Sequence, residues 1–262
     1  MRKSIISAIA LFFLCGQVLA QVVKINWNNK IPIAKKVKKT LEAGVSKFQA
    51  EYSCLGPVLT FSDSNMSDLK TMNDEIYPIM AFHQRLVLND DLDDQDLSLE
   101  EIQANECHEL FHSMTPDTVT KIPEFEIFKG YTIFAKKGLT LKMKDSTGKT
   151  FDLIIFEEGA AHVTGYKFTK KKYSEKYPQY EKLRLYTQGM IDSGWFTIKD
   201  LIYAEKNSNI NFIFGKILNK KPESITPADM RIIIKSCFSN FFEKKSEIDE
   251  LREKIKNIRY PK

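Results

Sequence analysis

The sequence predicts an α+β fold whose β-containing first half extends to about residue 156 and whose second half, from about residue 157, is mostly helical. Segments typical of β-strands cluster before residue 156, and helix-like segments dominate after it. The composition, 43% hydrophobic and 28% charged, is that of a chain with a buried core. No repeat of solenoid length occurs, so we expect one domain, or two closely packed subdomains, over residues 21–262.

The amino-terminal residues 1–20 resemble a secretory signal peptide. Arg2 and Lys3 precede an apolar run over Ile5–Leu14, and Val18–Ala20 offers a cleavage site before Gln21. The alternative is an uncleaved membrane anchor, but the apolar run is short for a span that needs about 20 residues. We therefore expect an exported protein, periplasmic or secreted, with no stable membrane span after cleavage.

The charge of the chain argues against nucleic-acid binding. The formal net charge is +5, and the lysines are spread over runs such as Lys35–Lys39 and Lys170–Lys172. Such runs are typical of solvated faces, and no known nucleic-acid-binding signature accompanies them. We expect no nucleic-acid partner, and the sequence does not indicate an oligomeric state.

Three cysteines follow the predicted cleavage site, namely Cys54, Cys107 and Cys237. An exported protein can form disulfides, but an odd number leaves one thiol unpaired within a monomer. Cys54 lies in a loop-like segment and is the better candidate for a bridge, although the pairing stays open. Without a CxxC pair, a structural zinc ribbon is not expected.

Before residue 98 the pattern predicts a helix, strands and an acidic turn. Apolar residues at helical spacing indicate a helix over Ile33–Tyr52, followed by a strand at Val58–Phe61. The segment Tyr77–Leu88 is rich in β-favouring residues and predicts one or two strands. The carboxylates of Asp90–Asp96 lack the glycine and final glutamate of an EF-hand, so we expect an acidic turn that leads into a helix rather than a calcium loop.

The β pattern resumes at Phe125 and ends near Phe156. The strands that we expect there are Tyr131–Phe134, Leu139–Met143 and Phe151–Phe156, with a turn at Asp145–Gly148 before the last. Helical spacing and capping residues predict the elements that follow. These are helices at Glu157–Phe168, Tyr180–Ile191, Thr197–Ala204 and Ile210–Leu218, and a long final helix after Pro227.

One predicted helix, Leu99–Met114, carries the residues with the clearest chemistry. Ser98 and Glu101 fit a capping box at its start, and Thr115-Pro116 ends it. Within it lies the sequence His108-Glu109-Leu110-Phe111-His112, an HExxH motif. The chain has only four histidines, so chance is a poor explanation for this spacing.

The HExxH spacing predicts a zinc site. Two imidazoles one turn apart on one helix face can bind a single Zn²⁺ ion. Glu109 is rotated about 100° from His108, so it can reach metal-bound water and act as a general base. The alternative is a surface helix whose histidine pair is merely solvated.

A third ligand would separate these interpretations, and the best donor lies in the later segment Glu157–His162. Its two adjacent carboxylates, Glu157 and Glu158, open a helix whose Ala160 and Ala161 allow another helix to approach closely. Either glutamate could complete an open zinc site that has three protein ligands. The alternative is that these acids only complement the helix dipole.

On these residues the chain resembles the gluzincin metallopeptidases, over roughly residues 98 to 168. The resemblance implies a zincin-like fold with the metal site between its two halves. It also implies one zinc ion held by His108, His112 and Glu158, with Glu109 as general base. In one branch of that superfamily an Asn precedes the ligand, where this chain has Glu157. In another branch an Asp follows the ligand by four positions, where this chain has His162.

The expected function is therefore that of an exported zinc peptidase acting on a peptide or protein. Candidates for the oxyanion donor or the second coordination shell are His162, Tyr166 and Tyr173, and by resemblance the Arg85–Leu88 strand would pair with an extended substrate. His83 is expected to be structural. The alternatives are a non-catalytic binding protein of zincin fold and a zinc hydrolase of a non-peptide amide.

Overall fold

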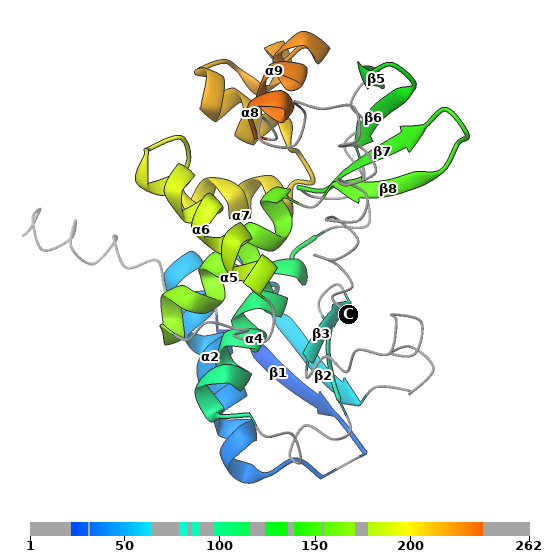
Figure 1. The fold of residues 1–262 in the computed structure, drawn as a ribbon. Helices are drawn as coiled ribbons and strands as arrows, with labels where there is room; N and C mark the ends of the chain where they lie inside the picture. Colours follow the sequence, from blue (N-terminus) through cyan, green and yellow to red (C-terminus); the bar gives the residue numbers. More distant parts are fainter. Residues whose placement is uncertain are drawn as a thin grey trace, which may run out of the picture.

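A computed structural model describes residues 22–30, 32–63, 79–82, 85–89, 97–115, 124–135, 139–153, 155–170 and 178–237. The predicted leader at residues 1–20, His83, the acidic segment 90–96 and Tyr173 lie outside these ranges. The described part is a mixed α+β structure with helices and two sheets, so the predicted α+β class is confirmed (Figure 1). No helix in the described part is both long and apolar enough to span a bilayer.

The first sheet has the strand order β1-β2-β4-β3. Its strands are β1 (Lys24–Asn28), β2 (Val58–Asp63), β3 (Ile79–Phe82) and β4 (Arg85–Leu88). The first two pair in parallel, as do β2 and β4, whereas β3 runs antiparallel to β4 at the edge of the sheet. Both sides of β4 are thus occupied, so the prediction that Arg85–Leu88 could pair with a substrate is wrong. Among the described strands β3 forms that edge of the sheet.

The strand β1 was not predicted, and its sequence explains why. Lys24–Asn28 is five residues long, alternates between exposed and half-buried positions, and contains two asparagines, which strands disfavour. Its place depends on tertiary contacts such as the stacking of Trp27 on Phe61, whose ring centroids lie 4.6 Å apart.

Two helices of the first half pack together. Helix α2 (Lys35–Tyr52), which connects β1 to β2, lies beside α4 (Leu99–His112), and α4 also packs against β3. The apolar residues predicted for α2, among them Leu41 and Phe48, are buried in the core. Cys54 and Cys107 are buried free thiols, and burial raises the pKa of Cys54 to about 12.

The second sheet is an antiparallel meander between α4 and the next helix along the chain. Its strands are β5 (Phe125–Phe128), β6 (Tyr131–Ala135), β7 (Leu141–Asp145) and β8 (Thr150–Leu153). The predicted turn after β7 is present, because Asp145 accepts from the amide of Thr147 and Gly148 adopts a φ of 84°. The last strand stops at Leu153 rather than at the predicted Phe156.

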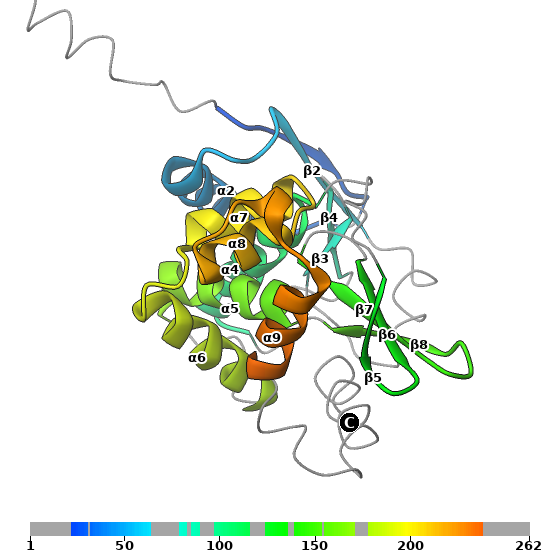
Figure 2. The same cartoon turned by 90° about the horizontal axis from the view of Figure 1, so that it is seen from above.

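Helices make up the chain after β8. They are α5 (Ile155–Thr169), α6 (Pro178–Asp192), α7 (Ile198–Lys206), α8 (Asn211–Leu218) and α9 (Pro227–Cys237), with a 3₁₀ turn at Pro222–Ser224. Helix α5 starts two residues before the predicted Glu157, because the buried Phe156 belongs to its first turn. It packs on both α4 and α6 (Figures 1 and 2), so the HExxH motif faces the segment that carries Glu158.

Candidate metal centre

The start of α4 is fixed by the capping box that the sequence predicted. The amide of Glu101 donates to Ser98 Oγ at 3.2 Å, and the amide of Ser98 donates to Glu101 Oε2 at 2.8 Å. Such a box satisfies two amides that a helix start leaves without a helical acceptor. The helix then runs without interruption through His108 and His112.

Small residues let α5 approach α4 closely. A Cβ atom placed on Gly165 would lie 2.6 Å from the carbonyl oxygen of Ala104, a distance that real Cβ atoms do not show. Ala160 and Ala161, which the sequence predicted to permit this approach, are fully buried. Gly165 was missed, because a lone glycine inside a helical pattern does not reveal which backbone it faces. The close packing brings Glu158 against the two histidines.

Three side chains meet closely enough to share a cation. The Nε2 atoms of His108 and His112 lie 3.1 Å apart. Glu158 Oε2 lies 3.4 Å from His108 Nε2, and Glu158 Oε1 lies 3.6 Å from His112 Nε2. Donors at zinc-bond lengths around a tetrahedral centre stand about 3.4 Å apart. The structure thus brings together the three residues that the sequence singled out as ligands.

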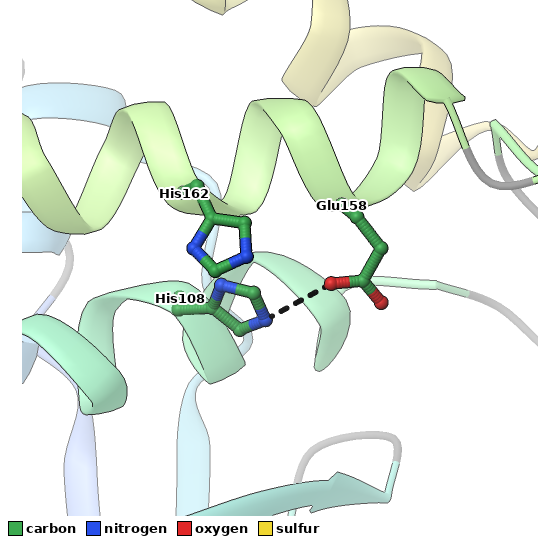
Figure 3. A group of neighbouring side chains, drawn as sticks. All are labelled: His108, Glu158 and His162. Carbon is green, nitrogen blue, oxygen red and sulfur yellow. Dashed lines mark ion pairs between the residues drawn. The ribbon is translucent and has the colours of Figure 1, made fainter. Parts of the chain in front are cut away.

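His162 offers a second set at the same place. Donor atoms of His108, Glu158 and His162 all lie within 4.8 Å of one another, and this buried triad could hold a metal ion. His162 follows Glu158 by one helical turn. Its ring packs against the ring of His108, with the two centroids 4.4 Å apart (Figure 3). We favour the set with His112, because the ring nitrogens of His108 and His112 lie 3.1 Å apart and each lies within 3.6 Å of a Glu158 oxygen.

The adjacent glutamates of α5 contact different atoms of the histidine pair. Glu157 Oε1 lies 3.3 Å from Nδ1 of His112, the ring nitrogen that points away from Glu158. A carboxylate behind a metal-binding histidine fixes its tautomer and orientation. The sequence left Glu157 and Glu158 as alternatives for one task, whereas the structure gives each of them a separate contact.

The charges of the centre reinforce one another. Burial opposes ionisation of Glu158, but the neighbouring His112 and His108 outweigh it and hold the pKa of Glu158 well below its usual value. Burial likewise opposes protonation of His112, yet Glu158 and Glu157 raise its pKa well above the usual value. His162 differs, because burial and the nearby His108 lower its pKa. In the metal-free chain Glu158 and His112 therefore form a charged pair, and a cation that binds here would have to displace the proton of His112.

Glu109 lies beside the candidate ligands. Its Oε1 is 3.7 Å from His108 Nε2, and its Oε2 accepts from the main-chain amide of Ala81 in β3 at 2.8 Å. Burial raises the pKa of Glu109, while His108 and His112 act in the opposite direction. A carboxylate so placed, with one oxygen toward the centre, can accept a proton there.

Tyr166 does not join this group. It follows Glu158 by eight residues, about 12 Å along the helix axis. Its ring lies under the guanidinium of Arg184 in α6, with 4.0 Å between that group and the ring centroid. No contact of Tyr166 with the candidate ligands is seen in the described residues.

Glu205 of α7 is a buried acid that the sequence analysis missed. It accepts from the hydroxyl of Thr115, just past α4, and from the amide of Leu139 at 2.9 Å. Burial and the charge of Glu157 raise its pKa to about 8. Glu205 falls on the same helix face as Leu201, which is fully buried. An acid at helical spacing from apolar residues was the sequence signal that could have indicated a buried carboxyl group.

Comparisons with protein-family models, with curated proteins and with solved structures gave no match. The arrangement of the site is therefore what bears on function.

Proposed function

We propose that this chain is a zinc-dependent peptidase of zincin-like fold. The observation that carries the proposal is the convergence of His108, His112 and Glu158, whose donor atoms stand 3.1 to 3.6 Å apart. A donor set of two imidazoles and one carboxylate suits Zn²⁺ better than the oxygen-preferring cations. Three protein ligands also leave a fourth position open, as in catalytic zinc sites.

A bound zinc ion would polarise a carbonyl oxygen and lower the pKa of a coordinated water to about 7. The protein's own contribution is to hold and move protons. Glu109, beside His108, accepts a proton from the attacking water and later passes it to the leaving amine. Glu157 holds His112 through Nδ1 and so keeps Nε2 directed at the centre.

The substrate class follows from the neighbouring strand. Within the described residues β3 pairs only with β4, and on its other edge the amide of Ala81 is bonded to Glu109, so an extended chain would add there through the remaining main-chain groups. An extended peptide can add to such an edge through main-chain hydrogen bonds. Because Ala81 of β3 contacts Glu109, a peptide at this edge would pass close to the proposed base. We infer a peptide or protein substrate and, from the leader-like residues 1–20, an exported enzyme.

Cleavage of a mixed peptide library, followed by mass spectrometry, tests the proposal. The zinc-loaded wild-type chain should hydrolyse peptide bonds, and a zinc chelator should stop it. Glu109→Gln should keep its zinc and lose about 10²- to 10⁴-fold in turnover, the usual contribution of a general base. Glu100→Gln, an exposed glutamate on the same helix, is the matched control and should behave as wild type.

Each other outcome has a distinct meaning. Equal turnover by Glu109→Gln and wild type would reject Glu109 as the base. Zinc-loaded wild type that cleaves non-peptide amides but no peptide would replace the substrate class. Zinc binding without any hydrolysis would reject the enzyme and leave a binding protein.

A further inference from the structure

The two carboxylate oxygens of Glu109 face different surroundings. Oε1 is directed toward the candidate centre, 3.7 Å from His108 Nε2, and Oε2 accepts the Ala81 amide at 2.8 Å. The HExxH motif predicts a base at this position but says nothing about what holds it. A glutamate side chain has several rotatable bonds, so a single hydrogen bond at its end restricts where the other oxygen can lie.

The amide that Glu109 uses comes from the outer side of β3. Ala81 is opposite Leu86 in the antiparallel ladder with β4. In such a ladder, residues that bond the partner strand alternate with residues that do not. Because the amide of Ala81 donates to Glu109, this amide points away from β4. By the alternation of the ladder, the main-chain amides of Met80 and Phe82 point toward β4. The amide of Ala81 is therefore not needed to hold the sheet together.

We propose that the main-chain amide of Ala81 is the positioning group for Glu109. This inference rests on the proposed function, since it assigns a support to the proposed base. It also links two parts of the site, because the strand to which we propose that a peptide adds is the strand that orients the carboxylate. Misplacing a catalytic group by about 1 Å can cost about 100-fold in rate. Loss of the amide should therefore lower kcat by about 10- to 100-fold and leave zinc content unchanged.

Hydrogen exchange tests this contact without any need for activity. In the zinc-loaded full chain, the Ala81 amide should be protected even though it points away from the sheet. Glu109→Ala should speed its exchange by at least about tenfold and leave the amides of Met80 and Phe82 unchanged. Glu100→Ala, which removes an exposed glutamate of the same helix, should change none of them. Equal protection of the Ala81 amide in wild type and Glu109→Ala would overturn the proposal.

Ala81→Pro tests the consequence for catalysis. Proline lacks the amide hydrogen, and edge strands tolerate it where that hydrogen does not pair with the neighbouring strand. We expect kcat to fall by about 10- to 100-fold with KM little changed, whereas Ala81→Gly, which keeps the amide, should retain most activity. In a Glu109→Gln background, Ala81→Pro should cost nothing further, because the group it positions is already inactive.

An equal loss from Ala81→Pro in both backgrounds would indicate a merely structural role and overturn the proposal. An unchanged kcat in Ala81→Pro would do the same. If Ala81→Pro does not fold, or if the wild type cleaves no peptide, the exchange measurement on Glu109→Ala still decides. Failure of the proposed function is thus distinguishable from failure of this inference.

Discussion

Glu157 contacts His112 at Nδ1, 3.3 Å away, on the side of the ring opposite to the candidate metal position. Its neighbour Glu158 contacts the Nε2 atoms on the metal side. One helix start thus supplies the proposed ligand Glu158 and the carboxylate that contacts the proposed ligand His112. Glu157 and Glu158 thus make different contacts, although the sequence alone offers no way to tell their roles apart.

Removing these two acids should therefore have different effects on zinc binding. Glu158→Ala should abolish stoichiometric zinc, because a direct ligand is lost. Glu157→Ala should keep the site but weaken zinc affinity by about 10- to 100-fold, as expected for the partner of a ligating histidine. Competition with a chromophoric chelator measures both affinities. Zinc retention by Glu158→Ala, together with loss by Glu157→Ala, would reverse the assignment.

We expect His162 to pack against the ring of His108 and not to bind the metal itself. X-ray absorption at the zinc edge counts the bound imidazoles, and we expect two in the wild type. The count should stay at two in His162→Ala and fall to one in His112→Ala. Because the ring of His162 packs against the ring of His108, removing the His162 side chain should still weaken zinc binding, though less than removing a ligand. A lower imidazole count in His162→Ala would make His162 a ligand.

The close approach of α4 and α5 can be tested with two glycines. Gly165→Ala would place a methyl group 2.6 Å from the Ala104 carbonyl oxygen, so the helices must separate. We expect a loss of about 1–3 kcal/mol in the free energy of unfolding. Gly189→Ala is the matched control, because nothing lies within 4 Å of its added Cβ. It should be neutral or stabilising by up to about 1 kcal/mol. Urea unfolding of the metal-free variants gives both values, and equal stability of the two would contradict this packing.

Glu205 should make the stability of the metal-free chain depend on pH. Its pKa is about 8 in the folded chain, against a usual value of 4.5. Between these pH values the unfolded chain has released the proton while the folded chain keeps it. Stability should therefore decrease as pH rises through this window. Glu205→Gln should flatten the dependence, measured by urea midpoints from about pH 5 to about pH 8. The control is Glu223→Gln, an exposed glutamate, and an unchanged slope in Glu205→Gln would refute the assignment.

Much of the fold and of the candidate site could be predicted because the signals are local. The capping box of Ser98 and Glu101 and the turn at Asp145 depend on residues within a few positions of each other. The HExxH spacing likewise fixes which side chains share a helix face.

What the sequence could not reveal depends on tertiary contacts. The hydrogen bond from Ala81 to Glu109 uses a main-chain group that every non-proline residue carries, so no residue type marks it. Among the described strands β3, rather than β4, forms the edge of the sheet. The order in which strands pair cannot be deduced from the residues of one strand alone. Gly165 is understood only when the carbonyl of Ala104 is placed opposite it.

Anomalous diffraction at the zinc edge, from crystals of the zinc-loaded chain, tests the central claim most directly. We predict one peak within about 2.0–2.2 Å of Nε2 of both His108 and His112 and of a Glu158 oxygen, with no fourth protein ligand. The absence of zinc from this position would contradict the account. So would a peak whose fourth position is filled by His162, because a closed site leaves no room for the reacting water.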